Sequence, residues 1–242
     1  FYLAAALSLL SLLLVWGLLP ESLPAEQRSH GAVQIQGPKI REMMQALSGP
    51  IGFLLILAFL HNFALTNFEG IYSFYAQQRY GYDEKTVGLI LTVIGLVSAI
   101  VQGGLTGLFS KRFGDGLIIK VSLFASIFGF LLMILPETLP MVMTAAGFFV
   151  LTNAMLRPGV SSLISKKSDI GQGAAMGLNN AFMSLGRIIG PLWAGAALDI
   201  NLNYPFLTGA AIMLLGFLTS IKFLPRDDQE HLQPAGGKRL ES

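Results

Sequence analysis

The sequence predicts an all-α membrane protein with seven membrane-spanning helices, and three observations support this prediction. Apolar residues make up 53% of the chain and charged residues only 12%, whereas soluble domains carry about a quarter charged residues. The mean hydropathy is +0.62. Apolar runs of about 20 residues, enough for a helix to cross a ~30 Å hydrocarbon core, recur along the chain. They are too long and too continuously apolar for barrel strands, so helices must satisfy the backbone in lipid.

The first apolar run begins at Phe1 without the basic flank and small-residue cleavage site of a signal peptide. We therefore expect the chain to be the carboxy-terminal portion of a longer protein. Short connections rich in turn residues separate most of the runs, which makes successive helices antiparallel neighbours. The predicted spans are 1–19, 50–77, 87–109, 117–135, 140–164, 173–198 and 204–224.

Two polar segments complete the predicted domain organisation. Residues 20–49 contain a basic patch (Arg28, Lys39 and Arg41) and a short amphipathic helix over 39–47. We interpret this segment as a cytoplasmic linker between the helix at 1–19 and a six-helix bundle at 50–224. Residues 225–242 are polar and lack periodicity, which is typical of a disordered tail.

The distribution of lysine and arginine predicts the orientation, because these residues accumulate on the cytoplasmic side of membrane proteins. If the linker, the third and fifth connections and the tail share one side, that side holds twelve of them against two, Arg79 and Lys85, on the other. The carboxy terminus is therefore predicted to be cytoplasmic. The twelve are Arg28, Lys39, Arg41, Lys111, Arg112, Lys120, Lys166, Lys167, Lys222, Arg226, Lys238 and Arg239.

Composition and motifs argue against several classes of bound group. The chain has no cysteine, and its histidines (His30, His61 and His231) are scattered without metal-ligand spacing. No phosphate-binding glycine loop of the form GxxxxGK[ST] is present. We therefore predict no metal, no cofactor and no nucleic-acid partner.

One carboxylate lies well inside a predicted span, where a charge costs roughly 2.5–3.5 kcal/mol and usually faces protein or a wet cavity. This residue is Glu69. The polar residues Asn62, Thr66, Glu69 and Ser73 recur every three to four positions and so share one helix face. We predict that Glu69 carries protons or binds a cationic substrate; the alternative is a structural hydrogen bond. Aromatic residues that include Tyr72 flank this polar stripe.

Two arginines are the other intramembrane charges. Arg157 precedes Pro158, where a helix loses a hydrogen bond and can bend, and Asn153 lies one turn earlier. It is predicted either to pair with an acid during transport or to snorkel and bind freed carbonyls. Arg187 is predicted either to line a cavity or to play a structural part. Its polar neighbours on the same span are Asn179, Asn180 and Ser184.

Glycines recur at four-residue spacing in two spans, which favours close helix packing over a binding role. They are Gly173, Gly177, Gly186 and Gly190 in one span, and Gly103, Gly104 and Gly107 in the other.

Five stretches, taken in order, resemble the major facilitator superfamily, and specifically its twelve-helix drug:proton antiporter branch of NorA-like and Bmr-like multidrug efflux proteins, which is related to the tetracycline exporters. The similarity covers most of residues 1–224, and the last stretch is the most specific. The stretches are LPESL, FALTNFEGIYSFY, GLFSKRFGD, LRPGVSSLIS and GLNNAFMSLGRIIGPLWAGAALD.

The resemblance implies that residues 1–19 are the sixth family helix, the last of the amino-terminal bundle, and that 50–224 form the carboxy-terminal bundle of a major facilitator fold. Such proteins have two bundles that rock around a midplane site. The implied function is proton-coupled efflux of amphipathic or cationic drugs across the bacterial plasma (inner) membrane. The implied partners are a small-molecule substrate, protons, the lipid bilayer and the amino-terminal bundle of the same protein, without which we expect the chain to be inactive.

The resemblance also assigns roles to residues. Glu69 matches the family's acidic residue on the seventh helix, which handles protons and cationic drugs, and Arg157 matches an arginine on the tenth. The loop 107–115 resembles the second copy of the cytoplasmic gating motif, with Gly107, Lys111, Arg112, Gly114 and Asp115 as its residues. The substrate and proton site is predicted to comprise Glu69, Asn62, Thr66, Tyr72, Arg157, Asn153, Asn180 and Arg187.

Two positions depart from the family pattern. NorA-type relatives have an acidic residue three positions before the arginine of the tenth helix, and here that position is Ala154, beside Asn153. Arg187 stands where those relatives have a neutral residue. A coupling scheme that uses two carboxylates is therefore not supported by this sequence.

Three alternatives remain open at this point. A metabolite or sugar transporter would have the same fold. A seven-helix receptor would match the number of spans, but the long linker after the first span argues against it, and no lysine lies deep in the last span to hold retinal. A membrane enzyme would need a nucleophile–base or histidine–acid cluster, which the predicted spans lack.

Overall fold

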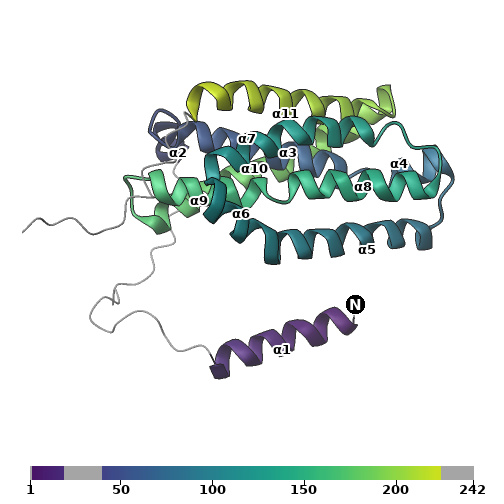
Figure 1. Cartoon of the computed structure of the whole chain (residues 1–242), viewed down its shortest axis with the longest axis horizontal. Helices are drawn as coiled ribbons and strands as arrows, with labels where there is room; N and C mark the ends of the chain where they lie inside the picture. The colour runs from purple at the N-terminus through teal and green to yellow at the C-terminus, as the bar shows by residue number, and fades with distance from the viewer. Residues whose placement is uncertain (1, 19–39, 225–242) are drawn as a thin grey trace, which may run out of the picture. The chain divides into compact units, whose positions relative to one another are not determined.

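The computed structural model describes residues 2–18 and 40–224 and divides the chain into two compact units, 1–39 and 40–242 (Figure 1). The described residues form helices and turns and include no strand. The described part of the first unit is one apolar helix, α1 (Tyr2–Leu18). With 17 residues, it is shorter than the long spans of the second unit.

The second unit is a helical bundle, and the all-helical prediction is confirmed. Among the described residues, six helices are long and apolar enough to cross a membrane, one for each predicted span of the bundle. The elements are α2 (Ile40–Leu47), α3 (Gly52–Glu69), α4 (Tyr72–Tyr80), α5 (Glu84–Ile100), the π-helix η2 (Val101–Leu105), α6 (Thr106–Phe113), α7 (Asp115–Leu132), α8 (Leu139–Asn153), α9 (Leu156–Lys167), α10 (Gln172–Ile200) and α11 (Tyr204–Phe223).

The predicted polar segments are described only in part. The amphipathic helix expected at 39–47 corresponds to α2. The predicted basic residues Arg28 and Lys39 and the predicted tail at 225–242 lie outside the described residues. The domain boundaries proposed from the sequence therefore stay predictions.

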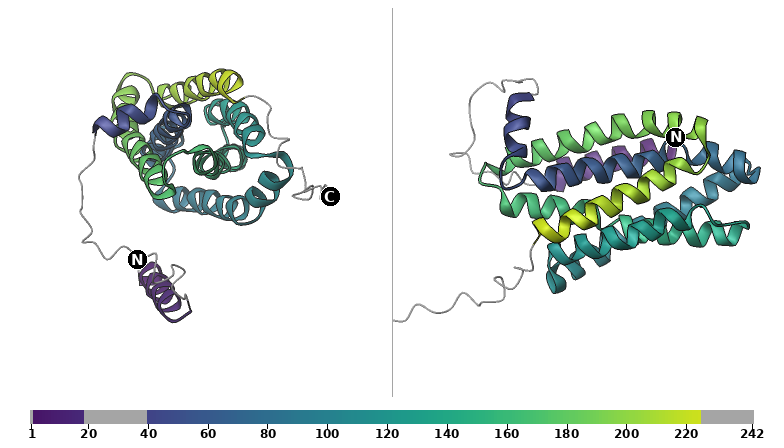
Figure 2. Two further views of the ribbon diagram at one scale, coloured as in Figure 1. Left: turned by 90° about the vertical axis from the view of Figure 1, so that its left-hand side faces the viewer. Right: turned by 90° about the horizontal axis from the view of Figure 1, so that it is seen from above.

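The bundle helices run side by side along its length (Figure 2), and α3 lies among α9, α10 and α11. The core at the Glu69 end of α3 is aromatic. The Phe68 ring lies 4.4 Å from that of Phe149 and 4.8 Å from that of Tyr72, and the Tyr75 and Phe206 rings are 4.6 Å apart. Tyr72 and Tyr75 are fully buried. This cluster joins α3 and α4 to α8 and α11.

Three of the predicted spans are interrupted helices. Between α3 and α4, the Ile71 N–H donates to the Phe68 carbonyl three residues back, at 3.2 Å, and not to the fourth. Between α8 and α9, Pro158 cannot donate to Ala154, and its ring crowds that carbonyl, so the bend expected at the proline falls one turn before it. In η2, the Thr106 N–H donates to Val101 five residues back.

Two of the glycine pairs behave differently from each other. A Cβ at Gly186 would lie 2.6 Å from the Phe59 carbonyl oxygen, and one at Gly190 would lie 2.3 Å from Thr66 Oγ1, so α10 contacts α3 as predicted. At the other five glycines of the predicted pattern, an added Cβ would have no described atom within 4 Å. The predicted close packing is therefore absent within the described part of the bundle at Gly173, Gly177, Gly103, Gly104 and Gly107.

Candidate functional site: the intramembrane charges

Glu69 is the last residue of α3, directly before the break at Gly70. It is exposed on the bundle, as is Ser73 at the start of α4. Gly70 in turn packs on α10, where a Cβ would lie 3.2 Å from the Pro191 ring. Among the described residues, Glu69 forms no ion pair and no side-chain hydrogen bond. An intramembrane carboxylate is thus placed at the surface of the bundle, where an outside partner can reach it.

The rest of the predicted polar stripe is used in packing. Asn62 is buried and its Nδ2 donates to the Ala58 carbonyl at 2.9 Å. Thr66 Oγ1 donates to the Asn62 carbonyl at 2.7 Å and approaches the Gly186 carbonyl of α10 at 3.3 Å. Tyr72 lies in the aromatic core. The stripe is therefore divided into an inner half packed against neighbouring helices and an exposed end at Glu69.

Arg157 lies in the first turn of α9, directly after the second helix break, and is exposed. Asn153, at the end of α8, is buried instead, and its Nδ2 donates to the Phe149 carbonyl at 2.9 Å. One turn after Arg157, Ser161 accepts a hydrogen bond of 3.0 Å from Asn179 Nδ2 of α10. Because residues four apart share a helix face, Arg157 lies on the side of α9 that borders α10.

Arg187 is exposed on α10, and Asn180 and Ser184 at helical spacing from it are exposed as well. Asn179, which the sequence placed with them, is 1% exposed and belongs to the hydrogen bond with α9. Glu69, Arg157 and Arg187 therefore lie on three helices that contact one another, α3, α9 and α10.

His61 is a buried titratable residue that the sequence analysis left out of the site. It is 2% exposed, and its Nδ1 atom has no hydrogen-bond partner among the described residues. α3 runs antiparallel to α8 and α9, and the Phe68 ring contacts that of Phe149. Counting back along α3 and forward along α8 and α9 from this contact places His61 at about the depth of Arg157. The histidine is therefore packed in the core of the bundle.

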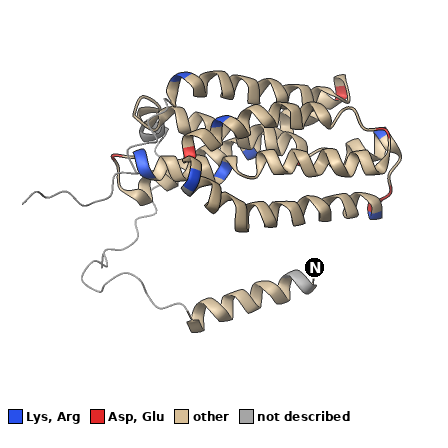
Figure 3. Cartoon of the chain, in the orientation of Figure 1, with Lys and Arg blue, Asp and Glu red and all other residues tan. Residues whose placement is uncertain are grey.

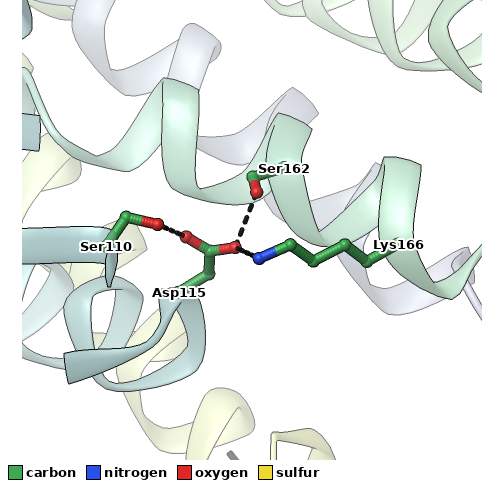
Figure 4. Close-up of polar contacts among 4 residues, drawn as sticks. All are labelled: Ser110, Asp115, Ser162 and Lys166. Carbon is green, nitrogen blue, oxygen red and sulfur yellow. Dashed lines mark hydrogen bonds and ion pairs between the residues drawn. The ribbon is translucent and has the colours of Figure 1, made fainter. Parts of the chain in front are cut away.

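The predicted gating loop leads to a buried carboxylate at the first residue of α7 (Figure 4). Asp115 is 2% exposed and accepts hydrogen bonds from Ser110 of α6, from Ser162 Oγ of α9 at 2.6 Å and from Lys166 Nζ of α9 at 2.7 Å. A carboxylate at a helix N-terminus also meets the positive end of the helix dipole. Asp115 therefore connects the α6–α7 turn to α9.

The other predicted loop residues are arranged around this turn. Gly114 adopts φ +77°, a left-handed conformation that glycine tolerates best. The Arg112 guanidinium lies 5.4 Å from the centre of the Phe113 ring and is exposed. Gly107 has open space around it, and the side chain of Lys111 lies outside the described residues.

Ser162 and Lys166 were missed as site residues in the sequence analysis, which used Lys166 only as a cytoplasmic charge. Their four-residue spacing on α9 was the available signal, because it places both on one face. No pattern in the sequence identified Asp115 as their partner 47 and 51 residues away.

Charged residues lie mostly toward the ends of the bundle helices (Figure 3). The residues that the structure describes contain no group of three or more His, Asp or Glu side chains suited to a metal. A cavity of about 350 Å³ lies at the α2 end and contains none of the intramembrane charges; its lining is Leu47, Ser48, Gly49, Pro50, Phe53, Leu54, Lys167, Phe223 and Leu224. Glu69, Arg157 and Arg187 are all exposed, and we call the part of the bundle surface that carries them the open face.

Comparisons with known proteins place this arrangement among membrane transporters. The family model described as Major Facilitator Superfamily matches residues 1–169 and 54–241. Multidrug resistance protein 1 of Bacillus subtilis is 30% identical over 225 residues, 91% of this chain and 56% of that protein. Multidrug resistance protein 2 of the same organism is 26% identical over 89% of the chain and 54% of its own length. The quinolone resistance protein NorA of Staphylococcus aureus is 27% identical over 89% and 54%.

Solved structures show the same fold. The human organic anion transporter MFSD10 (TETRAN) superposes with a TM-score of 0.71 and 22% identity, covering 90% of this chain and 56% of that one. The peptide transporter POT, crystallised as a mutant with sulfate, gives 0.63 and 20%, covering 71% and 37%. The chain spans about half the length of the curated relatives it matches.

Proposed function

The chain belongs to the Major Facilitator Superfamily, and from this premise we propose that it supplies one of two bundles of a transporter that exchanges protons for amphipathic small molecules, drugs among them. The observation that supports this proposal is Glu69, an exposed carboxylate at a helix break inside a multi-pass membrane bundle. Interrupted helices at the midplane are the places where transporters of this architecture bind substrates and ions.

The chemistry asked of Glu69 is proton transfer. A carboxyl group that meets water alternately from two sides of a membrane can take up a proton on one side and release it on the other. A substrate with a basic group competes with that proton for the same carboxylate. One group therefore suffices for exchange, and the second acid missing at Ala154 is not required.

The names of the relatives support drugs as the substrates, because three of them are multidrug or quinolone resistance proteins. The open face that carries the charges supports the need for a second bundle to close the site. The excess of lysine and arginine on one side supports a cytoplasmic carboxy terminus, and the bacterial relatives support the plasma membrane as the location.

The test is ethidium export from cells that express the intact transporter, with and without a proton uncoupler. We expect export that the uncoupler abolishes. Glu69→Gln should reduce export at least about ten-fold, which corresponds to a free-energy difference of about 1.4 kcal/mol. The matched control is Glu84→Gln, an exposed acid in the first turn of α5. Export that survives Glu69→Gln unchanged would refute the role of Glu69, and absence of drug export would favour a metabolite transporter of the same fold.

A further inference from the structure

The open face of the bundle carries more positive than negative charge. Its intramembrane charges are two guanidinium groups, Arg157 and Arg187, and one carboxylate, Glu69. The one ion pair that the described residues show, Lys166–Asp115, involves none of them. An unpaired charge in a membrane costs roughly 2.5–3.5 kcal/mol, so two arginines against one acid on this face, with no ion pair among them, require an explanation.

The two arginines lie close in depth. The hydrogen bond from Asn179 Nδ2 to Ser161 Oγ sets the register of α10 against α9. Moving away from the turn that joins these helices, Arg157 follows one helical turn beyond Ser161, and Arg187 two turns beyond Asn179. At 1.5 Å per residue, their backbones differ in depth by about 6 Å, which two long side chains can span.

The backbone adds to the positive potential at this point. Arg157 is in the first turn of α9, where the helix dipole presents its positive end. Two guanidinium groups side by side repel each other unless an anion lies between them. A carboxylate is the natural ligand, because the planar guanidinium binds both of its oxygens at once.

Glu69 lies about one turn beyond Arg187. Gly70 packs on Pro191, and Arg187 precedes Pro191 by one turn, so the carboxylate follows Arg187 along the seam between α3 and α10. A molecule with a basic group at one end and an acidic group at the other matches this order of charges. A molecule with a basic group alone leaves both guanidinium groups unpaired.

We propose that Arg157 and Arg187 bind the acidic group of the substrate, and that the transporter selects amphipathic zwitterions over lipophilic cations. This inference rests on the proposed function for its setting, a bundle that takes small molecules. It assigns the substrate class from the two arginines, one of which, Arg187, departs from the pattern of the efflux proteins that the sequence resembles.

A matched pair of dyes tests the proposal on the purified intact transporter in detergent. Rhodamine B carries a free carboxylate and a delocalised cation, and its ethyl ester has the same rings without the carboxylate. Binding is measured for each by fluorescence anisotropy. We expect the acid to bind at least about ten-fold more tightly than the ester, as is typical for a hydrogen bond to a charged group.

The variants separate recognition from folding. Arg187→Gln and Arg157→Gln are each expected to weaken binding of the acid about ten-fold while binding of the ester is unchanged, and Arg187→Lys, which keeps the charge, is expected to recover part of the loss. Arg79→Gln, an exposed arginine at the end of α4, is the control and is expected to bind both dyes normally. Equal binding of acid and ester, or equal loss of both in the arginine variants, would overturn the proposal.

The outcome is distinguishable from that of the ethidium test. Selective binding of the acid without uncoupler-sensitive export of either ethidium or rhodamine B would support the arginine site and refute proton-driven efflux. Uncoupler-sensitive export of ethidium with no preference for the acid would support efflux and refute the arginine site.

Discussion

The carboxylates Asp115 and Glu69 occupy opposite environments in one bundle. Asp115 is 2% exposed and receives hydrogen bonds from Ser110, Ser162 and Lys166. Glu69 is exposed and has no such donor among the described residues. The first carboxylate is satisfied within the fold, so its contribution is to hold α6, α7 and α9 together. We propose that the second binds a proton or a ligand.

The same contrast applies to the cations. Lys166 extends its ammonium to a buried partner, whereas Arg157 and Arg187 form no ion pair within the described bundle. A membrane charge costs free energy wherever it lies, so the difference indicates what each charge is for. The partnered Lys166 therefore contributes to the structure, and we propose that the unpartnered intramembrane charges serve transport.

The largest expected effect sharpens this contrast at Lys166. Lys166→Met leaves Asp115 as a buried carboxylate without its cation, and we expect a loss of about 3 kcal/mol in unfolding free energy, at the low end of the range for buried pairs because half of the lysine side chain is exposed. Thermal or detergent unfolding of the purified protein measures it. Asp115→Asn should cost less, since the amide keeps hydrogen bonds with the two serines.

Arg187→Gln is the matched control for Lys166→Met. It removes a cation that has no partner on the described bundle, so its effect on unfolding should stay within about 0.5 kcal/mol. If Arg187→Gln destabilised the protein as much as Lys166→Met, the division between structural and task-related charges would be wrong.

The next effect concerns the contact that positions Glu69. Gly190→Ala places a methyl group 2.3 Å from Thr66 Oγ1 and 2.7 Å from the Phe63 carbonyl oxygen. We expect α3 and α10 to move apart at a cost of about 2 kcal/mol. Gly177→Ala on the same helix meets open space and should be neutral or slightly stabilising, because alanine favours helix more than glycine. Equal stabilities of the two variants would contradict the contact.

The smallest effect concerns a third kind of carboxylate, the fully exposed Asp83 that caps α5. Thr86 donates to Asp83 Oδ1 from its backbone N–H at 2.9 Å and from Oγ1 at 2.6 Å, and these hydrogen bonds lower the pKa of Asp83. Its stabilisation is therefore fully present above the ordinary pKa of about 3.9 and is lost as the pH falls through the lower folded value.

Hydrogen exchange at the first turn of α5 measures this loss. Protection there should fall on acidification below about pH 4, while the rest of α5 stays protected. Asp83→Asn retains a capping side chain that does not titrate, so its protection should not depend on pH in this range. Equal pH dependence in both proteins would assign the effect to another group.

The sequence was sufficient for the fold because lipid imposes a length and an all-helical backbone on every span. It also predicted functional charges at Glu69, Arg157 and Arg187, which stand out against apolar surroundings, and the structure shows all three exposed; their role stays a prediction. The sequence did not show which residues of the polar face of α3 are packed inside the bundle and which are exposed. Asn62 and Thr66 share the periodicity of Glu69, yet they are used inside the bundle, because α10 approaches α3 at its glycines and leaves the end of the helix open.

Long-range partners were also beyond the sequence. Periodicity reports which residues share a face of one helix, and it is silent on which helix meets that face. The Asp115–Lys166 pair depends on the packing of α7 against α9, and the register of Arg157 against Arg187 depends on one hydrogen bond between Ser161 and Asn179. The glycines of η2 had the spacing of a helix contact without making one in the described part of the bundle.

The glycine contacts between α3 and α10 have a geometric consequence. Gly186 and Gly190 bring the two backbones so close that one helix cannot slide along the other without collision. The offset between Glu69 and Arg187 is therefore a property of the backbone and not of their flexible side chains. Under the proposal made for the two arginines, this constant offset would set the distance between the basic and acidic groups of the preferred substrate.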